Sequence, residues 1–164
     1  MTMQAEKTTM VPGSEIGGRN DTAVSEGLIG ALAGTYQLIT KTHLCHWNIT
    51  GTQFHAVHEM TATFYQNKFA AADDLAERVR ALGRPVTLDL TDAPRWNGPA
   101  PQDAGAPAGK MIGDLVHDHH QFATCLRELV ETAEHARDPA TADLATERVA
   151  FHEKAAWMLG ALIA

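Results

Sequence analysis

Apolar residues recur every three or four positions in four segments of the chain, and this spacing predicts amphipathic helices. The segments span about 21–48, 53–82, 110–136 and 139–162. In the first segment the apolar stripe ends in two histidines, in the order Leu28, Leu32, Tyr36, Ile39, His43 and His46. In the third and fourth segments a histidine lies within the stripe, at His119 and His152. The pattern predicts an all-α domain with one shared core.

The ends of the predicted helices carry residues that favour helix starts. Asp21 and Thr52 are placed to cap the first and second helices, and Asp138 followed by Pro139 is a well-matched start for the fourth. Residues 1–20 are polar and interrupted by Gly and Pro, so we expect a flexible N-terminal tail. The helical domain is then predicted to span 21–164.

The segment 84–109 separates the second and third helices and holds five of the seven prolines, which excludes a long regular helix. A loop of this length is unusual in a compact domain unless it has a task. Crossing the length of a bundle, so that the third helix runs parallel to the second, is such a task. The sequence therefore predicts a four-helix bundle with a long second-to-third crossover.

Composition and charge narrow the class of protein. A chain of 164 residues with 45% hydrophobic and 6% aromatic residues suits one mainly helical domain. The N-terminus lacks the apolar run of a signal peptide, and the two cysteines, Cys45 and Cys125, lie inside predicted helices. We therefore expect a reduced, cytoplasmic protein with no membrane segment.

The residues with the clearest chemistry lie in 43–78, which holds four of the nine histidines and a carboxylate pair one helical turn apart. Imidazole and carboxylate ligands suit iron or zinc. On one helix His58, Asp73 and Glu77 point broadly to one side, but the rise of an α-helix places Asp73 about 22 Å along the axis from His58. One subunit cannot bring both ends to one ion. Two copies packed antiparallel about a twofold could, and would build two identical sites.

Other interpretations of these residues stay open at this point. Asp73, Asp74 and Glu77 also fit an ordinary solvated face, and His46 fits a hydrogen-bonded histidine at a helix end. The run 117–120 (HDHH) places two histidines three residues apart, but off the apolar stripe, which favours a solvated patch over a metal site.

The sequence of this central stretch resembles the Dps family, the DNA-binding proteins from starved cells, also called mini-ferritins. The matching residues are His46-Trp47-Asn48, Gly51, Phe54, His58-Glu59, Asp73 and Ala76-Glu77-Arg78. The run 152–159 (HEKAAWML) is similar to the end of the last helix in this family. The resemblance covers most of 21–164.

The resemblance implies a ferritin-like four-helix bundle that assembles from twofold dimers into a hollow dodecamer. Its intersubunit ferroxidase centres would oxidise Fe(II) with hydrogen peroxide or dioxygen and keep the ferric mineral inside the shell. The implied ligands are His46 and His58 of one subunit and Asp73 and Glu77 of its twofold mate. Trp47, beside the site, is expected to accept oxidising equivalents.

One position departs from the family pattern. The family has a carboxylate one turn after the second histidine, where this chain has Ala62. Losing that ligand should weaken the site or change its metal preference, so zinc becomes an alternative occupant. His43, one turn before His46, and His152 are candidate extra ligands, as in the histidine-richer cyanobacterial-type members. Alternatively, each is a hydrogen-bonded histidine in a polar part of the interface.

The function predicted on these grounds is ferroxidase activity with iron storage, which protects against oxidative damage by removing both reactants of Fenton chemistry. A net charge of −7 fits attraction of cations. The alternative is a nucleoid-associated protein that binds DNA and whose metal sites, possibly zinc-occupied, are structural. The tail opposes this alternative, because it offers only Lys7 and Arg19 against Glu6 and Glu15. The resemblance also implies a short helical turn at 87–90.

Overall fold

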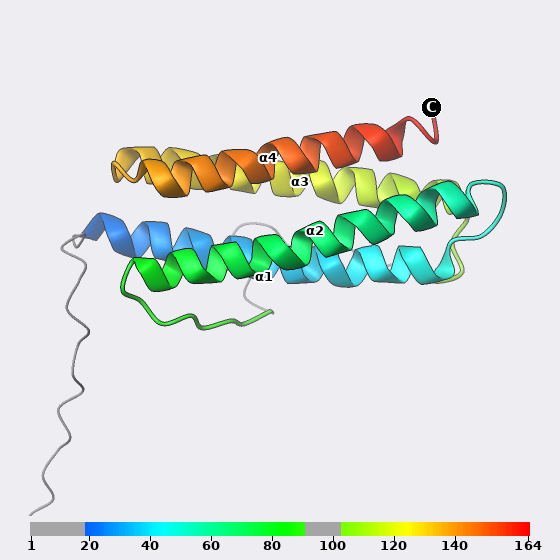
Figure 1. The fold of residues 1–164 in the computed structure, drawn as a ribbon. Helices are drawn as coiled ribbons and strands as arrows, with labels where there is room; N and C mark the ends of the chain where they lie inside the picture. The colour runs from blue at the N-terminus through cyan, green and yellow to red at the C-terminus, as the bar shows by residue number, and fades with distance from the viewer. Residues whose placement is uncertain (1–18, 91–102) are drawn as a thin grey trace, which may run out of the picture.

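The computed structural model describes residues 19–90 and 103–164, which form a four-helix bundle without strands (Figure 1). The helices are α1 (Arg19–Asn48), α2 (Phe54–Ala81), α3 (Ala108–His135) and α4 (Pro139–Gly160). α1 packs along α2, and α3 packs along α4, as two antiparallel pairs (Figure 1). This confirms the prediction of an all-α domain with four helices.

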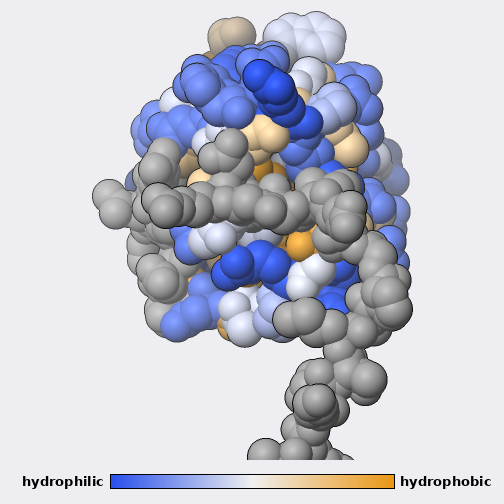
Figure 2. Space-filling model, turned by 90° about the vertical axis from the view of Figure 1, so that its left-hand side faces the viewer, coloured by the Kyte–Doolittle hydropathy of each residue, from blue (hydrophilic) through white to orange (hydrophobic). Residues whose placement is uncertain are grey.

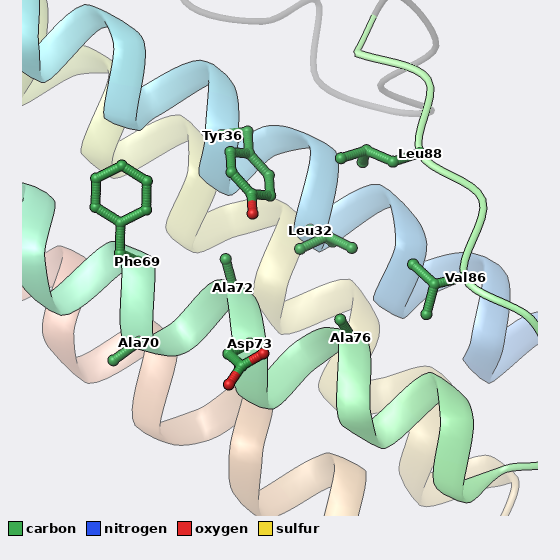
Figure 3. Close-up of a pocket in the computed structure, with 9 residues that line it drawn as sticks. All are labelled: Leu32, Tyr36, Phe69, Ala70, Ala72, Asp73, Ala76, Val86 and Leu88. Atoms are coloured by element: carbon green, nitrogen blue, oxygen red, sulfur yellow. The ribbon is translucent and has the colours of Figure 1, made fainter.

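α3 begins at the end of the bundle where α2 begins, so the two helices run parallel (Figure 1). The chain between them must therefore return along the bundle, as predicted for a long crossover. The predicted helical turn at 87–90 is wrong, because 84–89 has no regular structure. Val86 and Leu88 both line a groove between α1 and α2, and two residues this close in sequence reach one groove from extended chain (Figure 3).

The start of α4 is the predicted one. The Asp138 carboxylate accepts a hydrogen bond from the backbone N–H of Thr141 at 3.0 Å, and Pro139 occupies the first turn. Arg78 of α2 donates to Asp138 at 2.6 Å and to the Thr141 hydroxyl at 2.9 Å. Burial alone would raise the pKa of Asp138, but these hydrogen bonds outweigh it and lower the pKa. Arg78 therefore ties the end of α2 to the start of α4.

Two predicted starts are wrong by one or two residues. α1 begins at Arg19 and not at Asp21, so the predicted tail loses residues 19 and 20 to the helix, while residues 1–18 lie outside the described part of the chain. α2 begins at Phe54 with Gln53, not Thr52, at the cap position. The Gln53 amide instead donates to the carbonyl of Leu162, which fixes the α1–α2 connection against the end of α4.

The bundle end that carries the α3–α4 turn is largely hydrophilic on its surface (Figure 2), and apolar side chains fill the interior. Two apolar clusters make up the core. The first includes Leu28, Leu75 and Leu126, and the second includes Val57, Leu115 and Leu159. On each of the four helices the two clusters occupy separate stretches, with buried polar residues between them. They include Thr42, Lys68, His119 and His152, which we call the polar layer, and the neighbouring residues Lys41, Asp118 and Arg148.

Among the buried residues beside the polar layer, the negative charge comes from Asp118, which pairs with Lys41. Lys68 donates to the Thr42 hydroxyl at 2.8 Å, and the Nδ1 atoms of His119 and His152 lie 3.0 Å apart. Burial, with the charge of Arg148 adding to it, lowers the pKa of Lys68 to about 7. Burial and then the charge of Lys68 hold the pKa of both histidines well below the ordinary value. The polar layer is therefore a site of unfavourable desolvation within the core.

Replacing Lys68 with Met should stabilise the protein near neutral pH. The folded-state pKa is about 7 against an ordinary 10.5, so the unfolded chain binds a proton that the folded chain does not. The penalty is absent above the ordinary pKa, grows as pH falls, and is nearly complete at pH 7, where it is about 4 kcal/mol. We expect Lys68→Met to raise the melting temperature most at pH 7, with a smaller gain at about pH 9.

The control for this experiment is Lys154→Met, because Lys154 is exposed on α4. Both variants are compared with wild type at one subunit concentration, since the melting temperature of an assembly depends on concentration. A melting temperature that falls equally at both pH values in Lys68→Met would show that the charge of Lys68 is compensated in the folded state.

Candidate metal centre

His46 and His58 form a close pair where the end of α1 meets the first turns of α2. Their rings stack with centroids 3.7 Å apart and an interplanar angle of 20°. Nδ1 of His46 lies 3.0 Å from the carbonyl oxygen of His58, and Nδ1 of His58 lies 3.0 Å from that of His46. A carbonyl oxygen only accepts, so each Nδ1 carries the hydrogen. Each Nε2 is then left with a lone pair, as in metal-binding histidines held by a second hydrogen bond.

The Thr61 side chain contacts the His46 ring of this pair. Its hydroxyl donates to the carbonyl of Val57 at 2.6 Å, and its oxygen lies 3.0 Å from Nδ1 of His46. Thr61 is fully buried, so its hydroxyl holds the His46 ring without competition from water. Sequence reasoning missed this role, although the spacing of three residues from His58 on one helix could have pointed to it.

Aromatic side chains surround the histidine pair. Phe54 lies with its ring centroid 5.1 Å from that of His58, and Tyr65 meets His46 edge-on at 5.4 Å. His43 is placed beside the pair, and it stacks on Trp47 at 5.1 Å. Burial and then the charges of His46 and Lys68 lower the pKa of His43. Trp47 is 66% exposed in the single chain.

Asp73 and Glu77 are exposed on α2, and the single chain does not bring them to the histidine pair. α2 is one helix from Phe54 to Ala81, so the axial separation of about 22 Å between His58 and Asp73 holds. Within 19–90 and 103–164, no group of three or more His, Cys, Asp or Glu side chains lies together as a metal site. Neither carboxylate forms an ion pair within these ranges.

Asp73 borders a groove of about 460 Å³ between α1 and α2 (Figure 3). Apart from Asp73, the lining is apolar or aromatic: Leu32, Tyr36, Phe69, Ala70, Ala72, Ala76, Val86 and Leu88. Phe69 is 46% exposed and Leu88 is 42% exposed. A carboxylate at the edge of an exposed apolar surface is the kind of position that contact with another protein surface would cover.

The remaining histidines lie elsewhere. His152 is buried in the polar layer, and its ring contacts are with His119, Phe122 and Phe151. The structure therefore groups His152 with His119 and not with the pair at His46 and His58. His117 and His120 are exposed, which fits the predicted solvated patch.

Comparisons with known proteins place the chain among ferritin-like proteins. A model of the ferritin-like domain matches residues 26–164. The DNA protection during starvation protein of Helicobacter pylori is 32% identical, over 77% of this chain and 89% of its own length. An uncharacterised low temperature-induced protein of Nostoc is 34% identical, over 80% of this chain and 75% of its own. The crystal structure of a Dps protein from Bacillus brevis matches with a TM-score of 0.82 and 28% identity, covering 90% of this chain and 99% of that one.

Within 19–90 and 103–164, no helix combines the length and the apolar character that crossing a bilayer requires.

Thr61→Val should weaken metal binding at the histidine pair without unfolding the chain. Valine keeps the shape but removes the oxygen that holds Nδ1 of His46, and supporting groups of this kind typically change affinity about tenfold or more. The measurement is a calorimetric titration with Co(II) or Zn(II). Thr63→Val is the matched control, because the Thr63 hydroxyl is exposed and donates to the carbonyl of Glu59. Equal affinities for the two variants would contradict a role for Thr61.

Proposed function

This chain belongs to the Dps family of ferritin-like proteins, and we propose that it oxidises Fe(II) and stores the ferric product within a shell of its own copies. Family membership supports iron storage and protection against oxidative damage in general terms. The observation that carries the specific proposal is the reciprocal pair of His46 and His58, whose stacked rings keep each Nε2 out of these hydrogen bonds. Neutral imidazoles of this kind bind Fe(II) and other borderline cations.

The proposed centre is shared between two copies. His46 and His58 come from one copy, and Asp73 and Glu77 come from the second, packed antiparallel about a twofold axis. The apolar groove beside Asp73 and its exposed neighbour Phe69 support a contact on this face of α2. Both carboxylates lack an ion pair in the described chain, so they are available to a cation. We propose a dodecamer built from such dimers.

Iron is the substrate of this reaction. Two imidazoles and two carboxylates hold Fe(II), and the negative ligands favour the Fe(III) product over Fe(II). Hydrogen peroxide accepts two electrons, so one molecule oxidises two Fe(II) ions. Dioxygen is also proposed as an oxidant, with a slower reaction than hydrogen peroxide. The net charge of −7 draws further cations toward the protein.

Ala62 sets this centre apart from the family pattern, because the half-buried position after Thr61 offers no carboxylate. A centre with one fewer negative ligand should hold its ferric product less tightly. His43 contacts Tyr65, which in turn contacts His46, and we keep His43 as a proposed extra ligand. His152 lies in the polar layer beside His119, and its role as an extra ligand stays a prediction that the single chain does not support.

Direct binding of DNA is the weaker proposal. Relatives are named for DNA protection, but a net charge of −7 works against the counterion release that drives binding to phosphates. Removing peroxide and Fe(II) protects DNA without contact, so we propose protection through iron chemistry.

Fe(II) oxidation by the purified protein tests the proposal. Ferric absorbance is followed after adding hydrogen peroxide or air to wild type, His58→Ala and Glu77→Ala. Loss of a ligand should slow the reaction about tenfold or more in both variants, and hydrogen peroxide should outpace air. His55→Ala is the control, because His55 is an exposed histidine on the same helix. Both ligand variants oxidising iron at the wild-type rate would refute the site.

Mixing the two slow variants, His58→Ala and Glu77→Ala, tests whether the centre is shared. After dissociation and random reassembly, half of the dimers contain one copy of each variant, and such a dimer has one intact centre and one lacking both ligands. Activity should recover to about one quarter of wild type, because about one quarter of all centres are then intact. A mixture that stays as slow as its parents would show that His58 and Glu77 do not form one centre across the twofold axis.

A further inference from the structure

We propose that Tyr65 is an electron donor to the iron–peroxide reaction at this centre, and that His43 links it to Trp47. The inference rests on the proposed function and adds a specific redox role for a residue outside the ligand set. It starts from a continuous series of ring contacts that leads away from the histidine pair. The members in order are His58, His46, Tyr65, His43 and Trp47.

Tyr65 occupies the middle of this series. Its ring meets His46 edge-on, with centroids 5.4 Å apart and an interplanar angle of 85°. On its other side the centroid of His43 lies 4.2 Å away. His43 then stacks almost parallel on Trp47, at 5.1 Å and 4°. Each step is a direct ring contact, so an electron can pass between Trp47 and the metal ligand without crossing a solvent gap.

The chemistry explains why a donor at this position is useful. Hydrogen peroxide takes two electrons, whereas one Fe(II) ion gives one. When a centre holds a single Fe(II), the peroxide receives one electron and splits into hydroxide and a hydroxyl radical, and this radical then abstracts a hydrogen atom from a nearby bond. Trp47 is one oxidisable side chain near the pair, and the series of ring contacts reaches it after Tyr65 and His43.

The step balances with Tyr65 as the second donor. Fe(II) gives one electron, Tyr65 gives one electron and its phenolic proton, and hydrogen peroxide becomes one water and one hydroxide. The products that remain are Fe(III) and a neutral tyrosyl radical. A second Fe(II) and a proton then restore the tyrosine and yield a second Fe(III). The sum is two Fe(II) oxidised for each peroxide, with no radical released.

The chain offers a matched control because it has two tyrosines. Tyr36 lies on α1 and lines the groove beside Asp73, whereas Tyr65 contacts His46 and His43 (Figure 3). Phenylalanine keeps the ring and its packing in either position and removes the oxidisable hydroxyl. Tyr65→Phe and Tyr36→Phe are therefore compared under identical conditions.

The experiment loads the assembled protein anaerobically with one Fe(II) per centre, adds one equivalent of hydrogen peroxide and freezes the sample at once. Electron paramagnetic resonance then measures the tyrosyl radical, and optical absorbance measures ferric ion in the same sample. We expect a tyrosyl signal in wild type and Tyr36→Phe, and its loss in Tyr65→Phe. Peptide mass spectrometry should show more oxidised Trp47 in Tyr65→Phe, because the radical is no longer held at Tyr65.

The outcomes separate this inference from the proposed function. Normal ferric absorbance with no tyrosyl signal in wild type, or with a signal that survives in Tyr65→Phe, overturns the role of Tyr65 and leaves the ferroxidase intact. A signal lost only in Tyr36→Phe also overturns it. A wild-type protein that forms no ferric ion contradicts the proposed function, and the role of Tyr65 falls with it.

Discussion

The fixed rise of an unbroken α-helix is the constraint on which the proposed chemistry depends. α2 runs from Phe54 to Ala81, and its rise holds His58 and Asp73 about 22 Å apart in every copy. No rotation of a side chain closes that distance. A centre that uses both residues must therefore be completed by a second molecule, which makes assembly a condition of activity. The short connection between α1 and α2 brings the end of α1 back against the start of α2, and His46 therefore stacks on His58.

Two pairs of histidines in this chain look alike in sequence but differ in their surroundings. His46 and His58 give their Nδ1 hydrogens to backbone carbonyls, and His58 is partly exposed. His119 and His152 face each other inside the bundle beside Lys68, where burial keeps their pKa values low. All four lie on or near an apolar stripe, and periodicity reports only that a residue faces inward. The neighbours that decide between ligand and core histidine come from other helices.

Much of the fold could be predicted from the sequence because its signals are local. Apolar spacing gave the four helices, prolines gave the crossover, and Asp138 with Pro139 gave the start of α4. The predicted helical turn at 87–90 is wrong for a tertiary reason, because Val86 and Leu88 instead pack in extended chain against a groove between α1 and α2. The supporting role of Thr61 also depends on a contact with α1. The shared centre was inferred from helix geometry, and its ligand set stays a prediction.

An anaerobic crystal structure of the protein soaked with Fe(II) tests the central claim most directly, because anomalous scattering locates the iron. The account predicts iron bound by Nε2 of His46 and His58 from one copy and by Asp73 and Glu77 from a twofold-related copy. Iron held by the histidines of a copy whose neighbours keep their α2 carboxylates far away would contradict it.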